Sequence, residues 1–363
     1  MKAPVLHAVR EPLVVEDVEL DEPKAGEVLV KMAASGVCHS CLHAADGSWA
    51  APKTPMVLGD EGAGIVEKTG PGVTRLQQGD HVVLSWAPSC GWCHYCVTGH
   101  PVRCENRPAG GLLLDGTTRM HLKGQDVYHY ASIATFGSYS VVPESCAIKI
   151  DDDVPLDTAA LIGCSVMTGV GAVLNTAQAR PGDSVAVFGC GGIGLNAIQG
   201  GRLASAEPLI AVDVADNKLD YARSLGATHL INASKEDVPE RIKALTHGRG
   251  ADHAIVAVGS TQVAETAWTS LGRGGTCVMV GLPAVGEKIS IDPASLVGPE
   301  RRLVGSCYGS ASVFSDFPRI VNLYKSGKLK IDELITRRYG IDEANEAFRA
   351  LAAGELARGI LVF

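Results

Sequence analysis

The chain has 363 residues, of which 46% are hydrophobic and 20% are charged. This length exceeds one ordinary domain and matches two, which excludes a small protein held together by disulfides. The hydrophobic content is enough for a sizeable core, which excludes a mainly disordered chain. The net charge of -8, without a long basic run, gives no electrostatic footprint for nucleic acid or an anionic membrane, so we expect small-molecule partners.

Glycine is enriched and aromatic residues are few, with 42 Gly against 5% Phe, Trp and Tyr together. This balance favours an α/β protein with many tight turns over a helical bundle. The N-terminal segment lacks the basic start and uninterrupted apolar stretch of a targeting peptide, and no apolar run approaches the ~18 residues that span a bilayer. We therefore expect a soluble, cytoplasmic protein.

The expected elements change in kind along the chain. Residues 1 to about 150 predict a mainly β region, with short strands at 27–32, 63–67 and 81–84 between turn residues. From residue 183, strands alternate with helices, which indicates a doubly wound βα array. Its strands are expected at 184–188, 209–212, 254–258 and 276–280, and its helices at 193–204, 217–225 and 261–271. Helices at 313–326 and 342–353 and a strand at 359–363 close the chain.

A glycine motif opens the βα array, with Gly189, Gly191 and Gly194 in the spacing G-x-G-x-x-G. In this context the glycines allow a tight turn, a close approach of the backbone to a pyrophosphate, and close packing of the helix on the strand. Asp213 ends the next strand, where a carboxylate accepts ribose hydroxyls and repels a 2′-phosphate. The motif predicts a site for NAD rather than NADP; a glycine-rich turn followed by a solvated Asp is the alternative.

Four of the eleven cysteines are close together in the sequence, at Cys90, Cys93, Cys96 and Cys104. The odd total and this cluster indicate metal ligation in a reducing compartment rather than a disulfide framework. Four thiolates fill all positions of a tetrahedral zinc, so the predicted site is structural. Four unpaired buried cysteines and a zinc ribbon for nucleic acid are the alternatives, and the second conflicts with the charge.

These motifs, in this order, resemble the zinc-dependent medium-chain alcohol dehydrogenases, and the resemblance covers essentially the whole chain. It includes G-V-C-H-S at 36–40, G-D-E-G-A-G at 59–64 and G-C-S-V-M-T-G at 163–169. The stretch L-D-G-T-T-R at 114–119 is similar to the class III, glutathione-dependent formaldehyde dehydrogenase branch. The resemblance implies a GroES-like catalytic domain at 1–165 with a zinc lobe at 88–106, a Rossmann cofactor domain at 166–307, and a return to the catalytic domain at 308–363.

The resemblance also implies a second, catalytic zinc, held by Cys38, the residue at position 60 and Cys164, with one position open for water or substrate. The chain departs from the family here, because position 60 is Asp60 where the family has His. Position 41, where the family has an acidic residue, is Cys41. The two changes are complementary, because a thiol does not repel the Asp60 carboxylate as a second carboxylate would. Glu61 is expected as an alternate ligand or a neighbouring catalytic group.

Other roles come from the resemblance alone. Ser40 and His43 would carry the proton from the alcohol to solvent. The resemblance implies one set of residues that binds the NAD cofactor and a second set, with mostly large side chains, that lines the substrate pocket. The cofactor set is His39, Thr168, Gly189, Gly191, Gly192, Ile193, Gly194, Asp213, Lys218 and Arg358; the substrate set is Trp49, Trp86, Phe136 and Leu282.

The expected reaction is reversible NAD-linked oxidation of an alcohol, most suitably a primary aromatic, allylic or longer-chain one, with two zinc ions per subunit. Relatives are commonly dimers through their cofactor domains, so we expect a homodimer or homotetramer. Three rivals stay open: a reductase of C=C bonds that has lost the catalytic zinc, a thiol-adduct formaldehyde dehydrogenase, and a non-catalytic NAD-binding protein. One difference speaks against the thiol-adduct formaldehyde dehydrogenase. That branch has an arginine four residues after the last structural cysteine, whereas this chain has Pro108 at that position and Arg107 one position earlier.

Overall fold

The computed structural model describes residues 1–49, 51–355 and 357–363. The chain divides into two compact units, which are described separately: unit 1 comprises Met1–Ser165 and Ser312–Phe363, and unit 2 comprises Val166–Ala311. The second boundary falls slightly after the expected residue 307. Unit 1 is thus built from two segments separated by the whole of unit 2.

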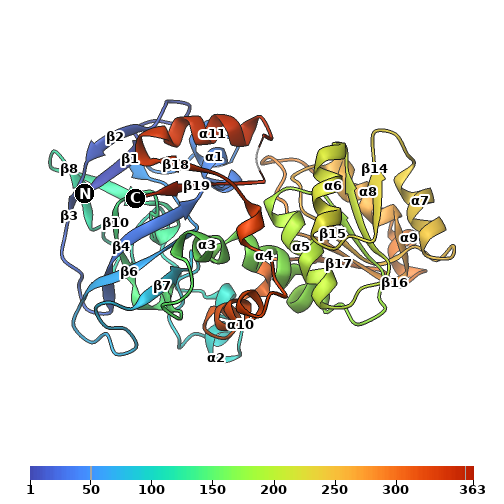
Figure 1. The fold of residues 1–363 in the computed structure, drawn as a ribbon, viewed down its shortest axis with the longest axis horizontal. Helices are drawn as coiled ribbons and strands as arrows, with labels where there is room; N and C mark the ends of the chain where they lie inside the picture. Colours follow the sequence, from blue (N-terminus) through green and yellow to red (C-terminus); the bar gives the residue numbers. More distant parts are fainter. Residues whose placement is uncertain (50, 356) are drawn as a thin grey trace. The chain divides into compact units, whose positions relative to one another are not determined.

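Unit 1 is rich in β-structure, as the sequence predicts (Figure 1). One sheet has the strand order β2-β1-β5-β9-β8-β3, and the other has the order β11-β7-β6-β4-β19-β18, with β10 also paired to β4. The strands of the first are β1 (Lys2–Leu6), β2 (Val14–Asp17), β3 (Glu19–Leu20), β5 (Met56–Val57), β8 (Met120–Leu122) and β9 (Gln125–His129). Those of the second are β4 (Glu27–Gly36), β6 (Gly62–Thr69), β7 (His81–Leu84), β10 (Tyr139–Pro143), β11 (Ala147–Lys149), β18 (Ile335–Gly340) and β19 (Arg358–Val362).

The C-terminal strand joins the two segments of unit 1. β19 pairs antiparallel with the end of β4, with Ile360 opposite Gly36 and Leu361 opposite Ser35, and it pairs parallel with β18 (Figure 1). Four consecutive residues of this strand, Arg358 to Leu361, are buried, as expected of a strand that lies between two others in its sheet. The helices of unit 1 are α1 (His39–Asp46), α2 (His94–Val97), α3 (Leu156–Ala160), α10 (Val313–Lys325) and α11 (Ala344–Ala352).

Unit 2 is a parallel sheet with the strand order β14-β13-β12-β15-β16-β17. Its strands are β12 (Val185–Phe188), β13 (Leu209–Asp213), β14 (His229–Asn232), β15 (Ala251–Val256), β16 (Leu271–Met279) and β17 (Arg302–Gly305). Its helices are α5 (Gly192–Leu203), α6 (Asp216–Ser224), α7 (Val238–Leu245), α8 (Thr261–Thr269) and α9 (Pro293–Val297), and α4 (Ser165–Gly171) begins at the unit boundary. The reversal of strand order beside β12 is the position at which doubly wound sheets bind dinucleotides.

Some element boundaries differ from the expectation. The strand expected at 254–258 is observed earlier, as β15, and the strand expected at 276–280 begins at Leu271, as β16. The glycines of L-G-R-G-G resemble a turn in the sequence, but the strand continues through them. A shift in the β15–β16 register, between the pairs Ala251–Leu271 and His253–Thr276, absorbs the extra residues as a bulge. The helix expected at 342–353 begins as a 3₁₀ turn, Ile341–Glu343, before α11.

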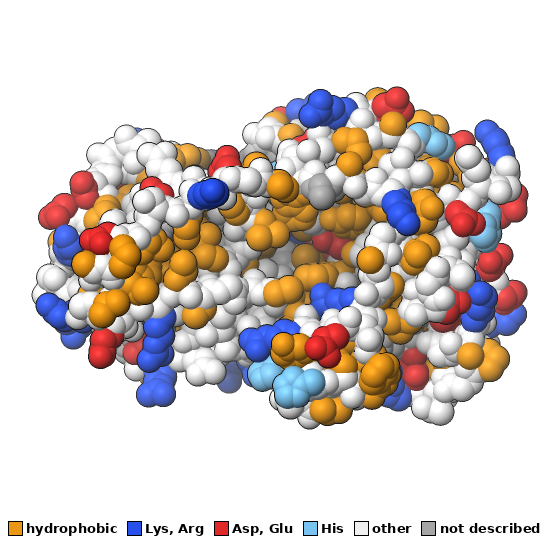
Figure 2. All heavy atoms as spheres, turned by 180° about the vertical axis from the view of Figure 1, so that it is seen from behind, with side chains coloured by type: hydrophobic (Ala, Val, Ile, Leu, Met, Phe, Trp, Pro, Cys, Tyr) orange, Lys and Arg blue, Asp and Glu red, His pale blue; other side chains and the backbone are white. Residues whose placement is uncertain are grey.

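The surface carries mixed charges. Figure 2 shows acidic and basic side chains interspersed over the face that it presents, with hydrophobic side chains between them. Among the described residues, no single helix is long and apolar enough to cross a membrane. One bent pair of consecutive helical segments, Leu156–Gly163 and Ser165–Ala177, reaches the required length and apolar composition only when the two segments are counted together.

Candidate functional site

Three potential metal ligands from distant parts of the sequence converge in unit 1. The Sγ atoms of Cys38 and Cys164 and a carboxylate oxygen of Asp60 all lie within 4.8 Å of one another. Each residue is at most 7% exposed, and both cysteines belong to the apolar cluster that forms the core between the N-terminal strands and α11. The predicted ligand set is therefore brought together at one buried point.

The backbone places each ligand at the end of an element. Cys38 is the extended N-cap residue of α1, directly after β4. Asp60 lies between β5 and β6, after Gly59, whose φ is +102°. A side chain at Gly59 would place its Cβ 2.4 Å from Oγ1 of Thr135, so both the backbone conformation and the space require glycine there.

The two oxygens of the Asp60 carboxylate have different partners. Oδ2 accepts a hydrogen bond from the Ser40 hydroxyl and lies 3.9 Å from Sγ of Cys164. Oδ1 accepts from the thiol of Cys41, with 3.5 Å between sulfur and oxygen. Cys41 thus faces Asp60 as the sequence predicts, whereas the bond from Ser40 to a ligand was not predicted.

Burial and charge shift the pKa values of these groups. Burial, with the nearby charge of Cys38, raises the pKa of Asp60 to about 7. The hydrogen bond from Cys164 lowers the pKa of the Cys38 thiol well below its usual value. Burial and the charge of Asp60 raise the pKa of Cys41, so that its thiol stays protonated and can donate. Anionic donors crowded in a buried site are costly unless a cation offsets them, and sulfur and carboxylate oxygen are zinc ligands, so these residues fit zinc.

Glu61 and Arg358, both predicted site residues, form a buried ion pair beside this group. Oε1 of Glu61 accepts from the amide and the hydroxyl of Ser165, at 2.8 and 2.6 Å, and Oε2 faces the guanidinium of Arg358. Both oxygens of Glu61 are therefore engaged outside the three-ligand group. Ser165 was missed in the sequence, although its place directly after Cys164 was a possible signal.

The expected proton-relay residues lie on α1. His43 is half-buried, with Nδ1 3.7 Å from Oδ2 of Asp46 and its ring centroid 5.2 Å from that of Trp49. His39 is exposed, with its ring centroid 5.9 Å from that of His43. The Ser40 hydroxyl donates to Asp60, so in this structure it is held at the ligand group rather than bonded to His43.

Tyr130 fixes the start of α1 and was not predicted. Its hydroxyl donates to the backbone oxygen of Ser40 at 3.0 Å, and its side chain packs against the same apolar cluster as the cysteine ligands. Burial raises the pKa of Tyr130 well above its usual value, so it remains a neutral donor. No sequence pattern marks this contact, because the two residues are 90 positions apart.

The expected substrate-pocket residues are found in different surroundings. Trp86 is half-buried against the apolar cluster that contains the cysteine ligands, and the guanidinium of Arg107 lies 5.7 Å from its ring centroid. Phe136 is fully buried, with its ring centroid 5.9 Å from that of Phe348. Leu282 belongs to unit 2, where it is 62% exposed.

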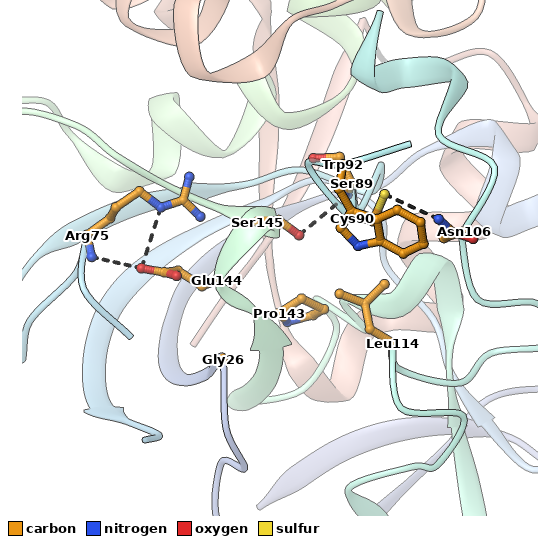
Figure 3. A pocket seen from close by; sticks show the side chains of 10 residues that line it. All are labelled: Gly26, Arg75, Ser89, Cys90, Trp92, Asn106, Leu114, Pro143, Glu144 and Ser145. Atoms are coloured by element: carbon orange, nitrogen blue, oxygen red, sulfur yellow. Dashed lines mark hydrogen bonds and ion pairs between the residues drawn. The ribbon is translucent and has the colours of Figure 1, made fainter. Parts of the chain in front are cut away.

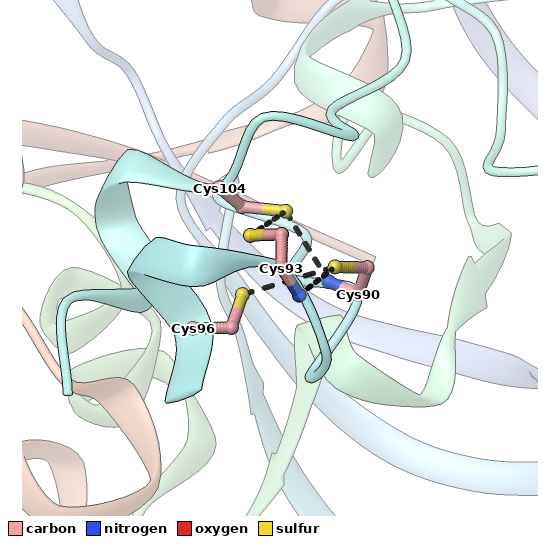
Figure 4. Close-up of side chains that lie close together, drawn as sticks. All are labelled: Cys90, Cys93, Cys96 and Cys104. Carbon is pink, nitrogen blue, oxygen red and sulfur yellow. Dashed lines mark hydrogen bonds between the residues drawn. The ribbon is translucent and has the colours of Figure 1, made fainter. Parts of the chain in front are cut away.

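The four clustered cysteines form a second group, on the lobe that carries α2 (Figure 4). The Sγ atoms of Cys90 and Cys96 are 4.0 Å apart, as are those of Cys93 and Cys104. Four sulfurs at about 2.3 Å from one zinc would be about 3.8 Å apart, so the thiols fit a tetrahedral ion. Although burial opposes it, hydrogen bonds from Asn106 and nearby amides lower the pKa of Cys90 to about 6, which favours its thiolate.

Unit 2 contains the predicted cofactor motif at the junction of β12 and α5. Gly191 is the N-cap of α5, and a Cβ at Gly194 would lie 1.7 Å from the oxygen of Gly189, so the helix can approach the strand only with glycine there. Asp213 ends β13, and its carboxylate accepts from the amides of Cys190, Val214 and Ala215 at 2.8, 2.8 and 3.1 Å. Of the other cofactor candidates in this unit, Thr168 is 7% exposed on α4, Lys218 is half-buried on α6, and Gly192 and Ile193 are in the first turn of α5.

A cavity of about 380 Å³ lies beside the four-cysteine lobe (Figure 3). Its polar side chains already bond within the protein, since the Asn106 amide donates to Sγ of Cys90 and Glu144 accepts from the amides of Thr74 and Arg75. This cavity adjoins the structural group and does not contain the three-ligand group.

Comparisons with known proteins agree with this geometry. The family described as "Alcohol dehydrogenase GroES-like domain" matches residues 24–152, and "Zinc-binding dehydrogenase" matches residues 192–326. The chain is 41% identical to the NDMA-dependent alcohol dehydrogenase of Amycolatopsis methanolica, over 99% of this chain and 98% of that protein. It is 38% identical to the S-(hydroxymethyl)glutathione dehydrogenase of Saccharomyces cerevisiae, over 99% of this chain and 95% of that protein.

Among solved structures, that of benzyl alcohol dehydrogenase from Acinetobacter calcoaceticus matches with a TM-score of 0.95 at 32% identity, covering 100% of this chain and 99% of that one. The matches extend over both units. They confirm the predicted fold class, a GroES-like β-rich domain with a Rossmann domain.

Proposed function

The chain belongs to the zinc-binding alcohol dehydrogenases with a GroES-like domain, and we propose that it oxidises primary aromatic, allylic or longer-chain alcohols reversibly with NAD. In the balanced reaction the alcohol loses a hydride to NAD and a proton to solvent, and an aldehyde is formed. The observation that supports it most is the convergence of Cys38, Asp60 and Cys164 at a buried point. That convergence speaks against the zinc-free reductase, which would need no such set.

Zinc and NAD would each supply one kind of chemistry. Zinc held by Cys38, Asp60 and Cys164 would act as a Lewis acid that lowers the pKa of the substrate hydroxyl. NAD held at the glycine motif would accept the hydride. The protein's own contribution is to hold the ligands in a buried site, where polar interactions are stronger than in water.

The chain's residues would also move the proton. The Ser40 hydroxyl is in contact with the ligand Asp60, so it is suitably placed to receive a proton from an alcohol at this site. His43 is three residues further along α1, on the same side of the helix, and an imidazole ring can both accept and release a proton. We assign the first transfer to Ser40, whose hydroxyl would turn from Asp60 and pass its own proton to His43 as its oxygen accepts the proton of the alcohol. The release to solvent is assigned to His43.

Cofactor selectivity is assigned to Asp213. Three backbone amides fix its carboxylate at the end of β13, so the charge cannot readily swing away from an approaching ribose. A 2′-phosphate would bring like charge against it, which favours NAD.

Substrate preference is assigned to the flat side chains near the ligand group. Trp86 contacts the apolar cluster that contains Cys38 and Cys164, and the Trp49 ring lies beside that of His43 at an interplanar angle of 46°. Each buried methylene adds ~0.8 kcal/mol, so a larger apolar alcohol gains more than ethanol. The similarity to a benzyl alcohol dehydrogenase supports this preference.

The test is a panel of alcohols assayed by the absorbance of reduced nicotinamide, with NAD and NADP side by side. We expect kcat/KM to rise from ethanol to benzyl and long-chain alcohols, and NAD to be preferred. Equal efficiency across the panel would refute the substrate class, and preference for NADP would refute the role of Asp213.

A thiol adduct of formaldehyde is a second candidate substrate, because two relatives, at 38% and 39% identity, are S-(hydroxymethyl)glutathione dehydrogenases. Against it, Arg107 donates to the backbone oxygen of Val102 and lies over Trp86, so its guanidinium is engaged within the protein. Adding S-(hydroxymethyl)glutathione to the panel separates the two: it should be a poorer substrate than benzyl alcohol.

A further inference from the structure

We propose that Cys41 is a positioning residue for the metal centre, because its thiol holds Oδ1 of the Asp60 carboxylate and leaves Oδ2 turned toward the metal. The inference rests on the proposed function, in which Cys38, Asp60 and Cys164 hold zinc. Cys41 itself is outside the group of mutually close ligand atoms. It would act on the metal only through Asp60.

The contacts of Cys41 connect the ligand segment to the helix that carries another ligand. Cys41 is fully buried in the first turn of α1, three residues after Cys38. Its sulfur lies 3.5 Å from Oδ1 of Asp60 and accepts from the backbone amide of Gly59. The thiol thus bonds to both the backbone before the ligand and the ligand's own side chain.

The other carboxylate oxygen has separate partners. Oδ2 accepts from the Ser40 hydroxyl and lies 3.9 Å from Sγ of Cys164, so it is the oxygen on the ligand side. With Oδ1 bonded to Cys41, the carboxylate is held against rotation about its Cβ–Cγ bond. Asp60 is then preorganised to bind a metal through one oxygen.

Removing the thiol would leave Oδ1 buried without that donor and would free the carboxylate to turn. A hydroxyl at position 41 retains a donor of similar size. A carboxylate there would place like charge opposite Asp60 in a buried site. The three replacements therefore have different expected effects, although all are small changes in volume.

The experiment compares the full-length, zinc-loaded wild type with Cys41→Ala, Cys41→Ser and Cys41→Asp. Cys146→Ala is the matched control, because Cys146 is an equally buried thiol of unit 1 outside both metal groups. The measurements are zinc per chain, the rate of zinc transfer to pyridylazoresorcinol, and the visible absorption of the Co²⁺-substituted protein. Asp60→Ala identifies which phase of zinc release belongs to the three-ligand group.

We expect Cys41→Ala to release this zinc about 10–100-fold faster than wild type, as changes to residues that orient metal ligands typically do, and to alter the Co²⁺ spectrum. Cys41→Ser should restore both toward wild type, Cys41→Asp should lose this zinc, and Cys146→Ala should match wild type. The four-cysteine group should keep its zinc in every variant, which shows that the fold persists.

Wild-type release and spectrum in Cys41→Ala would overturn the positioning role, and so would a serine variant as impaired as the alanine variant. If the wild type holds zinc only in the four-cysteine group, the proposed metal centre fails as well. The two failures are distinguishable, because only the second changes the zinc content of the wild type.

Discussion

Oδ2 of Asp60 lies 3.9 Å from Sγ of Cys164, although the two residues are 104 positions apart in the chain. A carboxylate and a thiol meet in a buried, largely apolar region, where neither is stable as an anion without a cation or hydrogen-bond donors. The proposed metal centre follows from this contact.

Asp213→Ser should weaken the preference for NAD. Without the carboxylate, the 2′-phosphate of NADP no longer meets like charge, so the ratio of kcat/KM for NAD over NADP should fall at least about tenfold, or about 1.4 kcal/mol. Steady-state kinetics with both cofactors measure the ratio. Asp220→Ser changes an exposed carboxylate of α6 and should leave it unaltered; an unchanged ratio in Asp213→Ser would show that selectivity lies elsewhere.

Trp86→Ala should reduce discrimination between benzyl alcohol and ethanol. The variant loses a large flat surface near the ligand group, so kcat/KM for benzyl alcohol relative to ethanol should fall about tenfold or more. Trp92→Ala is the control, because Trp92 is 71% exposed on the four-cysteine lobe. The pocket assignment is wrong if both variants keep the wild-type ranking.

Arg358→Met should destabilise the protein by about 3–5 kcal/mol, because it leaves the buried Glu61 carboxylate without its partner. Glu61→Gln combined with Arg358→Met removes both charges and should recover part of the loss. Thermal unfolding of the zinc-loaded proteins gives the comparison. A double variant less stable than Arg358→Met would contradict the ion pair as the source of the effect.

His129 should make the protein sensitive to acid. Burial and the charge of Arg119 lower the pKa of His129 to about 3, and its Nε2 accepts from the Arg119 amide. The unfolded chain binds a proton near pH 6.5 that the folded chain does not, so stability falls as the pH drops from about 6.5 toward 3. Between pH 7 and pH 5 this loss amounts to about 2 kcal/mol.

His129→Gln retains an acceptor but cannot be protonated, so it should lose less stability than wild type over that range. Unfolding midpoints at pH 7 and pH 5 measure the difference. His100→Gln, at an exposed site, should behave as wild type. Equal acid sensitivity in all three proteins would show that His129 is not responsible.

The sequence predicted features whose determinants are close together in the chain. The four cysteines lie within fifteen residues, and the glycine motif within six, so spacing alone indicates their chemistry. The strand His81–Leu84 was predicted at its observed boundaries because turn residues precede a short apolar run. The expected strand at 276–280 omits the first five residues of β16. Those residues include three glycines, which are typical of a turn, but a bulge in the β15–β16 pairing includes them in the strand.

The three-ligand group required the family resemblance, because Cys38, Asp60 and Cys164 have no local spacing. The complementarity of Asp60 and Cys41 was predictable from charge, whereas the contacts of Ser165 with Glu61 and of Tyr130 with Ser40 were not. These contacts depend on chain segments that only the fold brings together. Their roles follow from the positions of single oxygen atoms, which no sequence pattern specifies.

The zinc content of wild type and of Asp60→Ala tests the central claim most directly. With two metal groups in the chain, elemental analysis of purified protein should give about two zinc ions per chain in the wild type and about one in Asp60→Ala, with the four-cysteine group retained. Alcohol oxidation should be lost together with the second ion. One zinc in the wild type, or two zinc ions and full activity in Asp60→Ala, would contradict the account.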